Sequence, residues 1–237
     1  MVGVFASVSV LEYNAEADWT EISQIDNITN KDSRVHSNSI RKSRLSAVLV
    51  RSTNLNFWNG VSSMTGTYFV AKDKHYVITV HHGIVGPCWL TTVVHDEEHY
   101  HCKEYVATDE ENDYVIMEME TPIASREPLQ IPQDLPHGIE WKPSYSILNK
   151  IIYTGYPNTI GPLTLRGDVV GYGDEYLYIF SHAYAGASGS GVFTAEGKYI
   201  GYIVAIDVGM TEWGPDVLEN IVIVAPTFNV DWSSVLN

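Results

Sequence analysis

The chain has 237 residues, of which 45% are hydrophobic and 18% are charged, so its composition is that of a folded globular protein. Its formal net charge of −15 at pH 7 argues against nucleic acid as a partner, because nucleic-acid binders neutralise phosphates with clustered Lys and Arg. No stretch approaches the roughly 18 apolar residues that a membrane-spanning helix needs, which argues against a membrane partner.

The N-terminal region predicts neither a targeting signal nor a regular element. Met1–Val10 lacks a basic segment ahead of its apolar residues and a small-residue cleavage site, so we predict no signal peptide. The expected location is therefore the cytoplasm or the interior of a host cell. Residues 11–44 are mostly polar, with too few regularly spaced apolar positions for a strong helix or strand. Residues 1–44 are expected to form an N-terminal polar arm.

The only cysteines are Cys88 and Cys102, which allow one bridge at most. This count gives no sign of the disulfide framework of small secreted proteins. We expect both thiols to be free.

From Leu45 onward the sequence consists of short runs rich in β-branched and aromatic residues, separated by turn signals. This texture predicts an all-β sandwich or barrel, and the number of runs is compatible with two barrels of similar size. Asn229–Leu236 predicts a short closing helix, because Asp231 lies near its start. Eleven strands are predicted, at Ser46–Val50, Gly66–Ala71, Tyr76–Val80, Trp89–Val94, Tyr105–Ala107, Tyr114–Met119, Ile151–Thr154, Tyr176–Phe180, Gly191–Thr194, Tyr199–Ile206 and Ile221–Ala225.

Three segments carry residues suited to chemistry. His81 and His82 directly follow an apolar run, where the strand would fix the backbone and the turn would expose the rings. Asp113 opens another apolar run, a position where a buried carboxylate is costly unless it is paired. Ser188 lies in the glycine-rich turn Gly186–Gly191.

Together these segments indicate nucleophilic catalysis by a serine. A hydroxyl is inert at neutral pH without an adjacent base to take its proton, and histidine supplies such a base. The imidazole needs an acceptor that holds its tautomer, for which a partly buried aspartate serves. Glycines beside the serine let the backbone turn so that two N–H groups point at the place where negative charge develops.

The order of His82, Asp113 and Ser188 resembles that of the chymotrypsin-like, or trypsin-like, serine proteases. The likeness covers residues 45–237 and implies a serine protease domain of two antiparallel six-stranded β-barrels with a short C-terminal helix. Barrel one would span about residues 45–125 and barrel two about residues 145–225. Val77–His82 is similar to the family segment V-[LIV]-T-A-A-H, Asn112–Met117 to N-D-[LI]-A-L-L, and Gly186–Val192 to G-[DN]-S-G-[GS]-P-V.

The resemblance implies hydrolysis of peptide bonds through an acyl-enzyme, with His82 as general base, Asp113 as its orienting partner and Ser188 as nucleophile. The N–H groups of Gly186 and Ser188 would form the oxyanion hole. No cofactor or metal is required. The partner would be a protein or peptide substrate, with a polyprotein among the candidates, and the sequence leaves the oligomeric state undetermined. His81 is the competing base, but the family pattern has a small residue at that position.

The same likeness indicates which residues bind the substrate. His182 falls where the family has the floor of its primary specificity pocket. Val204, Ala205 and Ile206 fall where the family has the pocket wall that pairs with an extended substrate. The acidic floor found in trypsin is missing, so cleavage after Arg or Lys is not expected.

The chain also departs from the family pattern. Ala187 stands where the family usually has Asp or Asn, and no Ile-Val-Gly-Gly activation terminus is present, so activation by zymogen cleavage is not expected. Cys88 and Cys102 do not sit beside the histidine as the family's extracellular disulfide requires. The chain therefore resembles the compact, disulfide-free bacterial and viral members.

Two other kinds of catalytic site and one non-catalytic function compete with this interpretation. An α/β-hydrolase needs a helix after the serine and the order Ser, acid, His, whereas here a strand follows and the order is reversed. Residues 95–102 offer a zinc site through His95, His99, His101 and Cys102, but that spacing needs a helix and the flanks alternate like a β-hairpin. The alternative function is a catalytically idle pseudoprotease that acts as a peptide-binding or structural module.

Overall fold

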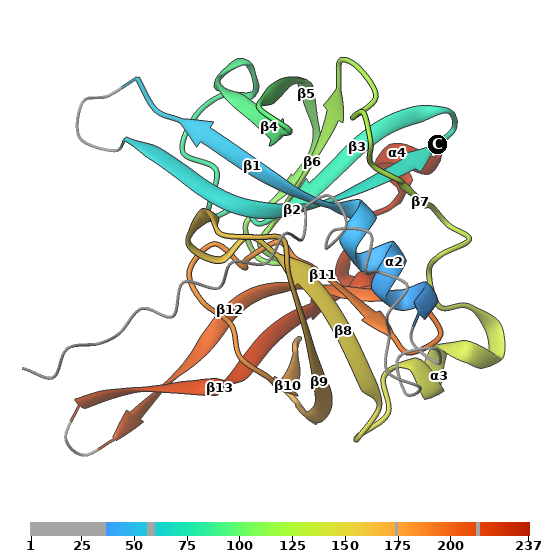
Figure 1. Cartoon of the computed structure of the whole chain (residues 1–237). Coiled ribbons are helices and arrows are strands. Elements are labelled where there is room, and N and C mark those ends of the chain that lie inside the picture. The colour runs from blue at the N-terminus through green and yellow to red at the C-terminus, as the bar shows by residue number, and fades with distance from the viewer. Residues whose placement is uncertain (1–36, 56–59, 174, 212–213) are drawn as a thin grey trace, which may run out of the picture. The chain divides into compact units, whose positions relative to one another are not determined.

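The computed structural model describes residues 37–55, 60–173, 175–211 and 214–237 (Figure 1). The chain divides into a unit of residues 1–34 and a compact unit of residues 35–237. All the described residues belong to the second unit. The predicted N-terminal arm therefore lies outside the described residues as far as residue 36.

Barrel one is an antiparallel barrel closed by the pairing of its first two strands. Its strand order is β1-β4-β5-β6-β3-β2, and β1 pairs again with β2. A two-residue strand, β7 (Leu129–Gln130), adds in parallel to β2. The interior holds mostly β-branched, aromatic and methionine side chains. The strands are β1 (Ala47–Thr53), β2 (Val61–Ala71), β3 (Lys74–Thr79), β4 (Thr91–His95), β5 (Glu98–Asp109) and β6 (Tyr114–Met119).

Barrel two is a closed antiparallel barrel with the strand order β10-β13-β12-β11-β8-β9. Its own core is built from inward-facing residues such as Ile151, Tyr153 and Val192, all fully buried. The strands are β8 (Lys150–Gly155), β9 (Leu163–Tyr172), β10 (Leu177–Phe180), β11 (Gly191–Thr194), β12 (Tyr199–Thr211) and β13 (Gly214–Pro226). The predicted fold class, two six-stranded antiparallel barrels, is confirmed.

The helices of the described residues are few and short. The expected C-terminal helix is confirmed as α4 (Ser233–Leu236), and it packs on barrel one, where Trp232 meets the ring of Phe69 edge-on at 5.6 Å. No helix among the described residues is long and apolar enough to cross a membrane. The others are α2 (Ser37–Ser46), α3 (Trp141–Ser144) and the 3-10 turns η3 (Cys88–Leu90), η4 (Gly138–Glu140), η5 (Pro157–Thr159) and η6 (Thr227–Asn229).

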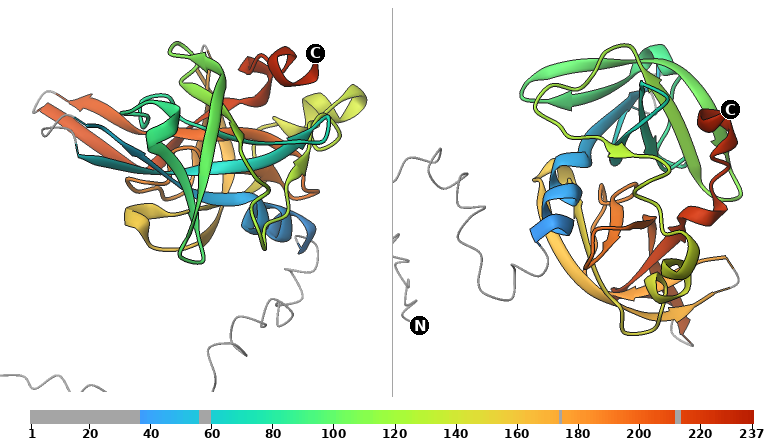
Figure 2. Two further views of the ribbon diagram at one scale, coloured as in Figure 1. Left: turned by 90° about the horizontal axis from the view of Figure 1, so that it is seen from above. Right: turned by 90° about the vertical axis from the view of Figure 1, so that its right-hand side faces the viewer.

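Helix α2 is a difference from the sequence analysis, which expected no element there. It lies along the side where the two barrels meet, next to β8 and β11 (Figure 2). Its buried face consists of Ser39, Ser43 and Ser46 rather than apolar residues, and Ser43 Oγ donates to Thr154 Oγ1 at 2.7 Å. A helix with a buried serine face has no apolar periodicity, so the pattern of hydrophobic residues could not reveal it.

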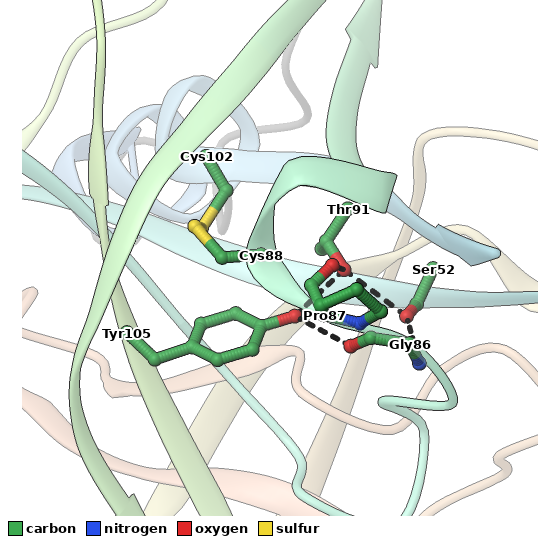
Figure 3. Close-up of a disulfide and its surroundings, with 7 residues drawn as sticks. All are labelled: Ser52, Gly86, Pro87, Cys88, Thr91, Cys102 and Tyr105. Carbon is green, nitrogen blue, oxygen red and sulfur yellow. Dashed lines mark hydrogen bonds between the residues drawn. A yellow bond between two sulfur atoms is a disulfide. The ribbon is translucent and has the colours of Figure 1, made fainter. Parts of the chain in front are cut away.

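The prediction of free thiols is wrong, because Cys88 and Cys102 form a disulfide (Figure 3). The β4–β5 hairpin pairs Thr92 with His101 and so returns the chain to the η3 turn, where Cys88 lies. The likeness to disulfide-free proteases therefore fails on this point. Disulfides are typical of oxidising compartments, so this bridge does not favour the expected intracellular location, which stays a prediction.

Candidate active site

The pairing of β3 with β6 brings His82 to Asp113. Thr79 lies opposite Val115, and continuing that register sets His81 opposite Asp113, whose carbonyl accepts a hydrogen bond from His81 N at 3.2 Å. The backbone N–H of His82 donates to Asp113 Oδ1 at 2.8 Å. Its ring Nδ1 lies 2.7 Å from Asp113 Oδ2. Both carboxylate oxygens are thus engaged by one residue.

This pairing defines the protonation pattern of the His82 ring. An ionised carboxylate can only accept, so Nδ1 carries the proton and Nε2 keeps a lone pair. The hydrogen bond that His82 Nδ1–H donates to Asp113 raises the pKa of His82 above its usual value of 6.5, and burial opposes that shift. The ring can therefore accept a proton at Nε2, and Asp113 would stabilise the resulting imidazolium.

The turn that carries Asp113 is supported from the other barrel. Asp113 adopts a left-handed φ of 53°, a conformation that costs free energy and persists where neighbours enforce it. The buried Tyr202 of β12 donates its hydroxyl to Asn112 O at 2.7 Å, and Tyr176 Oη lies 3.4 Å from Glu111 O. Sequence reasoning missed both tyrosines, because an aromatic residue in or beside an apolar strand predicts only core packing.

Ser188 lies in a tight turn in which two positions require glycine. Gly186 has a φ of 94°, and a Cβ there would lie 2.8 Å from Tyr156 O. Gly189 has a φ of 87°, and a Cβ there would lie 1.9 Å from Thr65 O. The glycine-rich pattern of the sequence therefore has a steric cause at both positions.

The same turn presents two backbone N–H groups without an acceptor. The carbonyl groups of Ala185 and Ala187 accept backbone hydrogen bonds at 2.7 and 3.0 Å. Since C=O and N–H point in opposite directions across a trans peptide, the N–H groups of Gly186 and Ser188 point away from those contacts. Neither donates to a protein acceptor within the described residues. Such a pair of donors can hold one anionic oxygen.

His82, Asp113 and Ser188 line one cavity of about 620 Å³. The Ser188 hydroxyl donates to Val204 O at 3.4 Å. No hydrogen bond joins this hydroxyl to the His82 ring in the part of the chain that the structure describes, and catalytic hydrogen bonds are often long or unformed in enzymes without substrate. The rest of the lining carries no charge and consists of Tyr176, Ala183, Tyr184, Ala185, Ile203, Val204, Ala205 and Ile223.

Two of the four predicted substrate-binding residues line the cleft. Val204 and Ala205 line the cleft. His182 is exposed and is not among the lining residues, and its neighbour Ala183 lines the cleft instead. Ile206 follows on β12, but its side chain lies outside the described residues. The signal that could have found Ala183 is its position in the segment just before the glycine turn.

His81, the competing base, has a different partner. Its Nε2 lies 3.9 Å from Glu110 Oε1, whereas His82 holds the Asp113 carboxylate and lines the cleft.

The histidine-rich segment weighed as a zinc site is a β-hairpin, as its alternation predicted. Cys102 is in the disulfide, and His99 and His101 are exposed on β5. His95 Nδ1 accepts from Arg126 Nη2 at 3.0 Å, and burial together with the Arg126 charge lowers the pKa of His95. No cluster of three or more candidate ligands occurs in the part of the chain that the structure describes.

No protein-family model and no curated protein sequence matches the chain. Solved structures match its architecture. The HtrA-type protease AlgW with a tripeptide has a TM-score of 0.61 at 14% identity over 82% of this chain, and the serine endoprotease from Yersinia pestis has 0.63 at 18% over 84%. The chain has the chymotrypsin-like protease fold. A third example of this fold, the active form of the Rv3671c protease from M. tuberculosis, has a TM-score of 0.63 at 16% identity.

The matches cover different shares of the three solved structures. The chain spans 60% of the length of the AlgW structure and 66% of that of the Yersinia pestis structure. The match to the Rv3671c structure covers 88% of that structure and 87% of this chain. At these identities the likeness establishes the chymotrypsin-like protease fold.

Proposed function

We propose that the chain is a serine endopeptidase that hydrolyses peptide bonds of a protein or peptide substrate. The observation that carries the proposal is the convergence of three features on one cavity. These are a carboxylate-paired histidine with a free Nε2, a serine hydroxyl, and two backbone N–H groups without an acceptor beside that serine. Serine proteases on unrelated folds share this set of groups.

Each step of the reaction uses groups of this chain alone. Ser188 Oγ would attack the scissile carbonyl while His82 Nε2 takes its proton, and Asp113 would stabilise the imidazolium. The N–H groups of Gly186 and Ser188 would hold the tetrahedral oxyanion. His82 would then give the proton to the leaving amine, and water would release the acyl group by the same route.

The cleft favours an uncharged residue before the scissile bond. Its only charged lining group, Asp113, is already paired with His82, so a Lys or Arg side chain would find no free counter-ion. The backbone hydrogen bonds between β12 and the Ser188 turn end at Ile203, which bonds to Gly189 and Ser190. Beyond it, Val204 O accepts the long contact from the Ser188 hydroxyl and Ala205 is exposed, so this edge of β12 could pair with the backbone of an extended substrate. We therefore propose Val204 and Ala205 as substrate-binding residues, with Ile206 continuing the same edge.

The test is covalent labelling of the purified protein by a fluorophosphonate probe, read as intact mass. The wild type should gain one probe adduct, and Ser188→Ala should gain none, because the probe reacts only with an activated serine. Peptidase activity on a peptide library should fall by several orders of magnitude in the same variant, since triad members act as a unit. Peptide-mass mapping of the wild-type adduct tests whether it lies on Ser188 rather than on Ser190, the other serine of the turn, whose hydroxyl donates to Ala187 O at 2.6 Å.

A pseudoprotease is the second candidate, because the Ser188 hydroxyl contacts Val204 O in this structure. A folded wild-type protein that gains no adduct and cleaves no library peptide would support this reading. Cleavage that persists in Ser188→Ala would contradict both readings.

A further inference from the structure

Thr65 of barrel one contacts the nucleophile turn of barrel two through both its backbone and its side chain. It is fully buried in β2. Its N–H donates to Ser188 O at 2.9 Å, and its hydroxyl donates to Gly186 O at 2.7 Å. The hydroxyl also accepts from Tyr156 N at 2.9 Å, and Thr65 O accepts from Thr79 Oγ1 at 2.7 Å. Every polar atom of Thr65 is thus engaged.

The two carbonyls that Thr65 binds belong to the two residues whose N–H groups are free. The Gly186–Ala187 peptide lies between the peptides that carry those N–H groups, so fixing its carbonyl restricts the dihedral angles on both sides. Gly186 is intrinsically permissive, and Ala187 has no polar side chain that could hold the turn. Within the turn, the remaining contact of this peptide is Ala187 N to Tyr184 O at 2.9 Å.

We propose that Thr65 is a positioning residue whose hydroxyl holds the oxyanion hole of this chain in its open form. The inference rests on the proposed serine endopeptidase function. Its hydroxyl acts on the turn from the opposite barrel, so the hole is formed only when the two barrels are packed together. Thr65 itself touches neither the substrate nor the reacting atoms.

The test compares Thr65→Val, which removes the hydroxyl at nearly constant volume, with Thr65→Ser, which restores it. Thr154→Val is the matched control, since Thr154 is equally buried and its hydroxyl has two partners, Ser43 and Thr164, away from the turn. One fluorogenic peptide, chosen from a library screened with the wild type, serves for all variants.

We expect Thr65→Val to lower kcat by about tenfold or more with KM within about twofold, because oxyanion-hole donors act mainly on the transition state. Thr65→Ser should recover most of the loss, and Thr154→Val should leave kcat unchanged. The ¹⁵N–¹H resonances of Gly186 and Ser188 should shift in Thr65→Val and not in Thr154→Val. The pKa of His82 should stay the same in all variants.

The outcomes separate this inference from the proposed function. A wild type that neither labels nor cleaves contradicts the proposed function, and the amide resonances then still decide whether Thr65 holds the turn. An active wild type with kcat preserved in Thr65→Val overturns the role of Thr65 alone. A Thr65→Ser variant as slow as Thr65→Val also overturns it, because packing rather than the hydroxyl would then be responsible.

Discussion

Two adjacent histidines follow β3, and their partners separate them. His82 engages both oxygens of Asp113, while His81 reaches only the exposed Glu110. A histidine base needs a hydrogen-bond acceptor at one ring nitrogen so that the other nitrogen can take a proton. Of the two histidines, only His82 has such an acceptor within hydrogen-bond distance among the described residues. The sequence alone distinguished the two by the family pattern, and the hydrogen bonds now supply a physical reason.

We predict that His82→Gln lowers kcat/KM by several orders of magnitude and that His81→Gln lowers it by less than about tenfold. Steady-state kinetics on one library-selected peptide measures both. The opposite ranking would mean that His81 is the base, and circular dichroism of each variant excludes unfolding as the cause.

The His82–Asp113 pair also predicts the acidic limb of the pH profile. Only neutral His82 can take a proton, so kcat/KM should rise with pH through the pKa of His82. Because the Asp113 hydrogen bond raises that pKa, the midpoint should lie above the usual 6.5. In Asp113→Asn the raising causes are lost and burial remains, so the midpoint should fall.

The pKa is measured directly as the NMR titration of the His82 ring, in Ser188→Ala to prevent self-digestion, with His82→Gln for assignment. Ser188→Ala/Asp113→Asn gives the second value. An unchanged His82 titration in that double variant would show that Asp113 does not set the pKa.

At the scale of elements, strands with a continuous apolar face were predictable and irregular ones were not. β6 and β11 match their predicted bounds, because they are buried along their whole length. β9 was not among the eleven strands predicted from the residue pattern, since its burial is uneven and glycines interrupt it; only the family resemblance, at residues 166–170, pointed to a strand there. β7 has two residues and exists only because it pairs with β2, which no local pattern encodes.

The candidate site divides in the same way. His82, Asp113 and Ser188 were predictable because each lies next to an apolar run, where a polar side chain is costly to bury unless it has a partner or a function. Thr65 and Tyr202 were not, because each lies inside a strand and acts on a turn of the other barrel. The Cys88–Cys102 bridge was missed for a different reason, because it depends on the β4–β5 hairpin returning the chain to the η3 turn.

The disulfide should stabilise the fold without setting the catalytic geometry. The turn after His82 is held independently of the disulfide. Val85 N donates to Ser52 Oγ at 3.1 Å. Gly86 N also donates to Ser52 Oγ at 3.1 Å, and Tyr105 Oη donates to Gly86 O at 3.1 Å (Figure 3). Closing a loop of this length contributes about 3 kcal/mol to the free energy of unfolding, which corresponds to roughly 6–12 °C in Tm for a domain of this size.

We therefore predict that Cys88→Ala/Cys102→Ala lowers Tm by about that amount and leaves kcat/KM within about threefold at a temperature where the variant is folded. Calorimetry and peptide cleavage measure the two effects. A large loss of kcat/KM in the folded variant would show instead that the bridge positions His82.

At the scale of the molecule, the site depends on contacts that cross between the barrels. Tyr202 of barrel two supports the Asp113 turn of barrel one, and Thr65 of barrel one holds the Ser188 turn of barrel two. Helix α2 adds a further tie, since Lys42 pairs with Asp134 on the segment between the barrels while Ser43 bonds to β8. Each half of the proposed machinery is thus supported by the opposite barrel.

The net charge of −15 should act on substrate encounter rather than on the cleft itself. The uncharged lining favours an apolar residue at the scissile bond, while the field of an acidic protein attracts cationic groups over longer distances. We predict that lysines placed several residues from the scissile bond raise kcat/KM at low ionic strength. The advantage should vanish at about 0.5 M salt, where screening shortens the reach of the field to a few ångströms. The measurement is kcat/KM against salt for two peptides that share the scissile sequence and differ only in flanking Lys or Glu. Equal salt dependence for both peptides would show that overall charge has no part in selecting the substrate.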